Sequence, residues 1–180
     1  MIQIGIIGSA GREEYPEKVK GLTNIYKIAK DLGELIAKRN AILITGGKGG
    51  VMKSAAEGAK SNGGVTVGIV KGDSRNTANK YIDIEISANT SGEGEEDILV
   101  SSCDGIIVVG GGAGTLQELA CAYRKKKPIV ACSAVDGIGK KYANSYLDER
   151  KSTKIYAAKN AKDIVDKLFL LIRESRKKKC

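Results

Sequence analysis

Short runs of apolar, largely β-branched residues alternate along the chain with longer segments in which apolar residues recur every three or four positions. The short runs predict buried strands, and the longer segments predict amphipathic helices. The predicted strands cover residues 2–7, 41–45, 65–70, 81–86, 105–109, 128–132 and 153–157. The predicted helices cover residues 16–39, 51–61, 95–102, 116–127 and 161–176. This alternation predicts one α/β domain over residues 1–180, a Rossmann-like doubly wound parallel sheet of about seven strands with helices on both faces.

Three segments carry more specific expectations. Residues 81–86 alternate strictly between polar and apolar, which is typical of a strand with one exposed face near the edge of a sheet. Residues 133–152 lack a regular period, and we interpret them as an irregular segment that folds over a cleft or meets a partner subunit. The basic tail at residues 174–180 is interpreted as a solvated helix end.

Two predicted strands run into glycine-rich turns that are each followed by a helix. The first turn lies within residues 45–52 (TGGKGGVM) and the second within residues 110–118 (GGGAGTLQE). Glycines let the backbone approach a ligand, and the first free N–H groups of a helix bind anions. The repetition argues against turns that serve the fold alone. Because the carboxyl ends of parallel strands meet at one edge, the two turns predict one phosphate-binding cleft.

The candidate phosphate- and nucleotide-binding residues lie in these turns and after the first strand. They are Gly8, Ser9, Gly46, Gly47, Gly49, Gly50, Gly111, Gly112, Gly114 and Thr115. Glu118, expected in the first helical turn, is the candidate catalytic carboxylate. Neither turn has the spacing of the dinucleotide fingerprint or of a P-loop, so a standard NAD or ATP site is not expected.

Composition removes several other classes of site. Histidine is absent, which excludes an imidazole base, a Ser–His pair and a His-ligated metal. The four cysteines, Cys103, Cys121, Cys132 and Cys180, form no C-x-x-C pair, so no metal site is expected. No apolar run approaches the roughly 18 residues of a membrane span, and the first predicted strand begins at once, so we expect a cytoplasmic protein without a signal peptide.

The formal net charge of +9 raises the question of a nucleic-acid partner. Much of the excess is local, in residues 124–127 and 173–179, where each basic run ends a predicted helix and complements its dipole. Aromatic residues are not interleaved with these runs, as a stacking platform for bases would require. The sequence therefore argues against nucleic acid and favours a small phosphorylated ligand.

The glycine turns resemble those of the Lonely-Guy-type Rossmann family, formerly labelled lysine-decarboxylase-like, over residues 2–132. Gly8-Ser9 and residues 45–52 match, and residues 111–118 are similar to the family's P-G-G-x-G-T-x-x-E signature, with Gly110 in place of the proline. The resemblance implies a homodimer or larger homo-oligomer that needs no cofactor and cleaves the N-glycosidic bond of nucleoside 5′-monophosphates.

The resemblance also implies roles for individual residues. Glu118 would be the catalytic carboxylate that stabilises an oxocarbenium-like centre or orients water. The glycines of residues 111–114 and Thr115 would hold the 5′-phosphate, while Ser9 and residues 46–47 would line the ribose and base. The family's arginine, thought to assist the departing base, falls near Glu95 here, and Arg75 or Lys48 would have to replace it.

With Gly110 at the place of the signature proline, the chain also resembles a neighbouring branch, the molybdenum-cofactor carrier proteins. Proteins of that branch bind a phosphate-bearing pterin without catalysing a reaction. Nothing in the sequence marks a lysine for a pyridoxal Schiff base, which argues against lysine decarboxylation. Three functions therefore stay open: a nucleoside 5′-monophosphate-binding protein, a phosphoribohydrolase acting on such nucleotides, and a molybdenum-cofactor carrier. The expected bound ligand is a nucleoside monophosphate or a phosphorylated pterin.

Overall fold

The computed structural model describes residues 1–11, 22–72, 74, 76–88 and 94–177. Within them lies a seven-stranded parallel sheet with the strand order β4-β3-β2-β1-β5-β6-β7. The strands are β1 (Gln3–Gly8), β2 (Ile42–Thr45), β3 (Thr66–Val70), β4 (Ile84–Ser87), β5 (Gly105–Val109), β6 (Ile129–Cys132) and β7 (Ile155–Ala158). The helices are α1 (Leu22–Lys38), α2 (Gly50–Ser61), α3 (Glu95–Ser101), α4 (Ala113–Arg124), α5 (Ile138–Lys141) and α6 (Ala161–Lys177). The predicted Rossmann-like α/β fold is confirmed.

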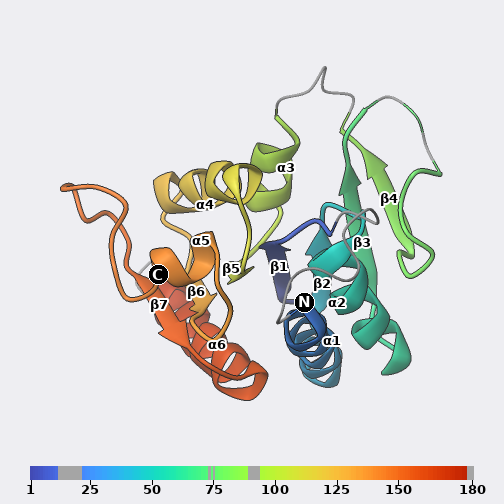
Figure 1. Cartoon of the computed structure of the whole chain (residues 1–180), viewed down its shortest axis with the longest axis horizontal. Helices are drawn as coiled ribbons and strands as arrows, with labels where there is room; N and C mark the ends of the chain where they lie inside the picture. Colours follow the sequence, from blue (N-terminus) through green and yellow to red (C-terminus); the bar gives the residue numbers. More distant parts are fainter. Residues whose placement is uncertain (12–21, 73, 75, 89–93, 178–180) are drawn as a thin grey trace.

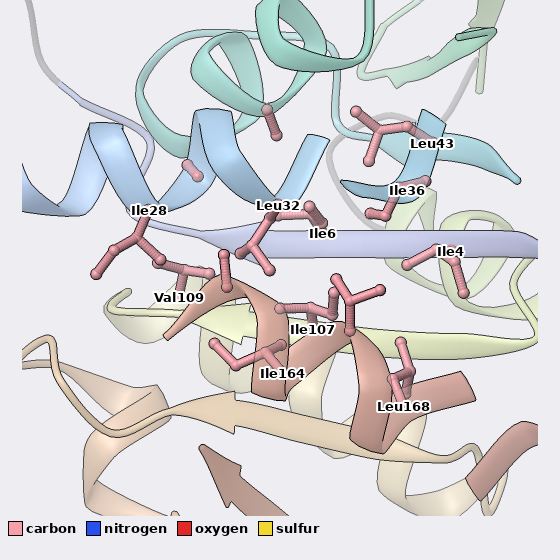
Figure 2. Packing of buried hydrophobic residues seen from close by; sticks show 14 of the residues in the cluster. Ile4, Ile6, Ile28, Leu32, Ile36, Leu43, Ile107, Val109, Ile164 and Leu168 are labelled. Atoms are coloured by element: carbon pink, nitrogen blue, oxygen red, sulfur yellow. The ribbon is translucent and has the colours of Figure 1, made fainter. Parts of the chain in front are cut away.

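The helices cover both faces of the sheet. Helices α1, α2 and α6 pack on one face, and α3 and α4 pack on the other (Figure 1). Every residue of β3, β5 and β6 is buried, as expected of parallel strands that are covered on both faces. Figure 2 shows part of the first core, where Leu32 of α1 and Ile164 of α6 pack against side chains of β1 and β5.

The order of the strands reverses at β1. The chain runs from β1 to β2, β3 and β4 on one side, and then returns to place β5 on the other side of β1. Open parallel sheets bind ligands in the crevice beyond the carboxyl ends of their strands at such a switch point. The turns that follow β1, β2 and β5 are the three that the sequence analysis singled out.

Two helices differ from the prediction. Helix α4 begins at Ala113, three residues earlier than expected, because the N–H of Leu116 already donates to the carbonyl of Gly112 (3.0 Å). Glu118 therefore lies in the second helical turn rather than the first. Within residues 133–152, expected to be irregular, the four-residue helix α5 forms, which is too short to leave a period in the sequence.

The edge position of the strand predicted at residues 81–86 is confirmed, since β4 ends the sheet. The strand itself is shorter and shifted toward the carboxyl end, and its exposed positions are apolar: Ile84 and Ile86 are 50% and 43% exposed. The expected start of the first helix, near Pro16, lies outside the described residues. Within the described part of the chain, no helix has both the length and the apolar character needed to cross a bilayer.

Candidate functional site

A cavity of about 530 Å³ opens at the carboxyl ends of β1, β2, β3 and β5. Its volume lies within the range of roughly 300–1,000 Å³ that is common for small-molecule sites. The sequence-predicted residues that line it are Gly8, Gly46, Gly112, Gly114, Thr115 and Glu118. The others, Ser9, Gly47, Gly49, Gly50 and Gly111, belong to the same turns but are not part of the cavity wall. The structure thus brings the two predicted glycine turns to one cavity.

The turn after β2 is held by side chains on both sides. Thr45 Oγ1 accepts the backbone N–H of Gly47 (3.0 Å), and Gly47 has a φ of +70°, which favours glycine. The side-chain Nδ2 of Asn79 donates to the carbonyl oxygens of Gly47 (3.0 Å) and Lys48 (2.8 Å), and the backbone N–H of Asn79 also donates to Gly47 (2.7 Å). Asn79 therefore fixes the direction of two consecutive peptide groups.

The direction of these carbonyls determines where the next N–H groups point. In a trans peptide the C=O and the following N–H point in opposite directions, so the N–H groups of Lys48 and Gly49 face away from Asn79. Within the described residues no group accepts a hydrogen bond from either N–H. Two adjacent amides are thus open to an acceptor at the N-terminus of α2. Sequence reasoning missed Asn79, which stands in a polar loop with no motif around it.

The turn after β5 uses the same arrangement. The N–H groups of Ile138 and Gly139 donate to the carbonyls of Gly111 (3.0 Å) and Gly110 (2.9 Å), so the N–H of Gly112 points away from α5. No acceptor for the Gly112 N–H lies in the described part of the chain. None of residues 133–152 lines the cavity, and α5 instead supports the turn from behind; contact of this segment with a partner subunit, the other alternative, stays a prediction.

Ser9 joins the two turns. Its Oγ accepts the N–H of Gly111 (2.9 Å), and its carbonyl accepts the N–H of Val51 at the start of α2 (3.0 Å). The approach is close enough that a Cβ on Gly50 would lie 2.3 Å from the Ser9 carbonyl oxygen. A Cβ on Gly8 would lie 2.1 Å from the carbonyl oxygen of Val109. These glycines permit backbone contact between the strand ends.

Three carboxyl groups form another part of the wall. Glu95 and Glu96 come from α3, and Glu118 comes from α4. Burial raises the pKa of the Glu118 carboxyl to about 8, and the charges of Glu96 and Glu95 add to the effect. Glu118 therefore keeps its proton at neutral pH. Among the described residues no donor or acceptor forms a hydrogen bond with its carboxyl group.

The Lonely-Guy family's arginine was expected near Glu95, and in the structure Glu95 and Glu96 line the cavity at that place. Lys71 Nζ lies 3.8 Å from Glu95 Oε1 and lines the same cavity. Lys48 also lines the cavity, and its Nζ donates to the carbonyl of Thr77 (3.1 Å). Arg75 lies outside the described residues.

The remaining wall is apolar, formed in part by Met52, Ile69 and Leu99. None of the three cysteines that the structure describes lines the cavity: Cys103 and Cys132 are buried elsewhere, and Cys121 is half-buried. In the part of the chain that the structure describes, no three Cys, Asp or Glu side chains are grouped as metal ligands would be. The arrangement offers amide donors, a neutral carboxyl group and ionised carboxylates around one apolar space.

Comparison with known proteins places the chain in a family. The model of the SLOG cluster4 family matches residues 1–165. The chain belongs to the SLOG cluster4 family. A relative from Archaeoglobus fulgidus, named as an uncharacterized protein, is 40% identical to this chain over 131 residues. These residues are 73% of this chain and 80% of the relative.

Solved structures resemble this SLOG protein over nearly its whole length. The molybdenum cofactor binding protein from Rippkaea orientalis is 29% identical, with a TM-score of 0.78, covering 95% of this chain and 97% of the other. The molybdenum cofactor carrier protein from Chlamydomonas reinhardtii is 27% identical, with a TM-score of 0.76, covering 96% and 98%. These matches support the wider Rossmann-like superfamily that the glycine turns indicated, and not the Lonely-Guy enzymes in particular.

Proposed function

We propose that this SLOG protein binds a small phosphorylated ligand, first of all a nucleoside 5′-monophosphate, with the phosphate held between the two glycine turns. The observation that carries the proposal is the pair of turns whose carbonyls are held back by Asn79 and by α5. Their N–H groups at Lys48, Gly49 and Gly112 have no acceptor in the described part of the chain. Helix N-termini with free N–H groups bind phosphate well because their partial charges add to the hydrogen bonds.

Binding without hydrolysis suits the carboxyl groups of the cavity. A catalytic carboxylate that stabilises an oxocarbenium-like centre must be ionised, and burial with two neighbouring glutamates keeps Glu118 protonated at neutral pH. The place of the cation that would assist the departing base carries Glu95 instead. In this proposal the protein therefore retains the nucleotide and does not cleave it.

A molybdenum-cofactor carrier is the second candidate function. Two structural relatives with TM-scores of 0.78 and 0.76 are named for binding or carrying that cofactor. A carrier needs a phosphate-binding turn and a space for a flat ring, and the same cavity offers both. Fluorescence of a pterin in the purified protein would support this candidate over the nucleotide.

Calorimetry tests the phosphate anchor. The protein is titrated with ribose 5-phosphate, with a nucleoside 5′-monophosphate and with the same nucleoside lacking phosphate. The proposal predicts that both phosphates bind and that the nucleoside binds at least about a hundredfold more weakly, because the charge-assisted hydrogen bonds are lost. Equal affinity for nucleotide and nucleoside would contradict it.

Chromatography separates binding from hydrolysis. The protein is incubated with AMP, and free adenine is measured over time. The proposal predicts no release of base. Release that disappears in Glu118→Gln would establish the hydrolase instead, with Glu118 as its catalytic residue.

A further inference from the structure

One wall of the cavity is acidic although the turns beside it are suited to an anion. Glu95 and Glu96 at the start of α3 and Glu118 in the second turn of α4 all line it. Glu95 is paired with Lys71 (3.8 Å), whereas the Oε2 of Glu96 accepts the N–H of Gly94 (3.2 Å). No described donor reaches Oε1 of Glu96 or either oxygen of Glu118. The wall thus has hydrogen-bonding capacity that the fold does not use.

The two carboxyl groups differ in what they can offer. A protonated carboxyl such as that of Glu118 donates one hydrogen bond, while an ionised carboxylate such as that of Glu96 only accepts. A phosphate would be repelled here, so the part of the ligand at this wall must present N–H donors and an acceptor. Met52, Ile69 and Leu99 supply apolar surface that a flat ring could contact.

We propose that this wall recognises a 2-amino-4-oxopyrimidine ring, the edge that guanine and pterins share. The carboxylate of Glu96 accepts hydrogen bonds from the ring N–H and the exocyclic amine, and Glu118 donates to the ring carbonyl oxygen. The proposal rests on the proposed function, because the phosphate at the glycine turns sets the orientation of the ring. Adenine lacks this edge, and hypoxanthine has the ring N–H but no exocyclic amine.

Calorimetry with a series of ligands tests the ring specificity. The full chain is titrated with ribose 5-phosphate, GMP, IMP and AMP at pH 7. GMP is expected to bind at least about tenfold more tightly than IMP, the loss expected when one hydrogen bond to a charged group is removed. AMP is expected to bind no more tightly than IMP.

Two variants on the same helix assign the effect to Glu96. In Glu96→Gln, GMP is expected to bind no more tightly than IMP. The affinity of this variant for ribose 5-phosphate is expected to stay within about twofold of that of the parent protein, which also shows that the variant is folded. Asp97→Asn is the matched control. Asp97 is exposed, pairs with Lys125 (2.9 Å) and does not line the cavity, so the preference for GMP is expected to remain.

A pterin ligand distinguishes the two sources of the ring. If dihydroneopterin monophosphate binds more tightly than GMP, and Glu96→Gln weakens it equally, the ring is that of a pterin; the reverse order identifies guanine. Equal affinities for GMP, IMP and AMP, with ribose 5-phosphate still bound, would overturn the ring proposal and leave the phosphate anchor intact. Failure of every phosphorylated ligand to bind would overturn both.

Discussion

Glu118 shows how the fold changes the chemistry of one side chain. Its pKa is raised to about 8 from an ordinary value of 4.5 by burial and by the charges of Glu96 and Glu95. The folded state therefore binds this proton more tightly than the unfolded chain does. The resulting stabilisation is fully present below about pH 4.5 and is lost as the pH rises through about 8.

Glu118→Gln removes this titration and keeps the shape of the side chain. We expect the variant and the parent protein to have similar free energies of unfolding at pH 5. At pH 9 the variant should be the more stable by at least about 1 kcal/mol, the equivalent of less than one pKa unit. Urea unfolding at both values checks this. A difference that does not change with pH would contradict the raised pKa.

Asn79 is a second residue whose role is visible only in three dimensions. Its side chain donates to the carbonyls of Gly47 and Lys48, and alanine would keep only the backbone N–H that also donates to Gly47, so Asn79→Ala frees the peptide group between Lys48 and Gly49 to rotate. We expect the affinity for ribose 5-phosphate to fall about tenfold or more, because the Gly49 N–H is no longer held toward an acceptor. Calorimetry measures the change.

Asn62→Ala is the control for this effect. Asn62 donates to the carbonyl of Gly58 (3.1 Å) at the other end of α2, far along the helix from the turn. Its loss should lower stability without altering the affinity for ribose 5-phosphate. If both alanine variants bind as the parent protein does, Asn79 does not position the turn.

At the scale of elements, helices α1 and α2 approach each other through two glycines. A Cβ on Gly33 would lie 1.9 Å from the carbonyl oxygen of Ala55, and one on Gly58 would lie 2.0 Å from that of Lys30. Backbone atoms cannot move aside as a flexible side chain can. The close packing of these helices fixes the N-terminus of α2 beside the cavity.

Alanine at these glycines tests the packing. Gly33→Ala or Gly58→Ala should lower the free energy of unfolding by about 2 kcal/mol, because the clash outweighs the roughly 1 kcal/mol gained in helix propensity. Gly114→Ala, at an open position of α4, should raise it instead. Urea unfolding compares the three variants, and a gain in stability at Gly33 would show that the helices are not in close contact.

The elements that the sequence predicted well are those whose pattern is set by burial. The runs around Ile4, Ile44 and Ile107 lie in strands because a covered parallel sheet needs uninterrupted apolar residues. Strand β4 begins later than predicted because Asp83 binds Thr66 instead of continuing the strand. The carboxylate of Asp83 accepts hydrogen bonds from the N–H (2.9 Å) and the hydroxyl (3.0 Å) of Thr66. Such a contact between distant residues leaves no period in the sequence.

At the scale of the whole molecule, the glycine turns could be found from sequence because strand, glycines and helix are adjacent in the chain. Their convergence on one cavity followed from the parallel sheet. The supports behind the turns could not be found, because Asn79 and Ile138 meet them only after the chain has folded. Nor could the place of Glu118 in the acidic wall, which depends on how α3 packs against α4.

Three exposed isoleucines bear on the assembly of the protein. Ile84 and Ile86 on the edge strand β4 and Ile98 on α3 are 50%, 43% and 37% exposed. We expect a homodimer that covers these residues, since apolar surface of this kind favours association. Light scattering should give about twice the 19.0 kDa of one chain. Ile84→Lys together with Ile86→Lys should give the monomer, and a parent protein that is monomeric at all concentrations would contradict this expectation.

The affinity of ribose 5-phosphate for Gly112→Val tests the phosphate anchor most directly. A Cβ on Gly112 meets no atom within 4 Å and projects into open space at the turn, so the variant should unfold at the same temperature as the parent protein. Ala113→Val, at the neighbouring exposed position that does not line the cavity, is the control. We expect binding to be lost in Gly112→Val and kept in Ala113→Val. Unchanged binding in Gly112→Val would mean that the phosphate does not lie between the two turns.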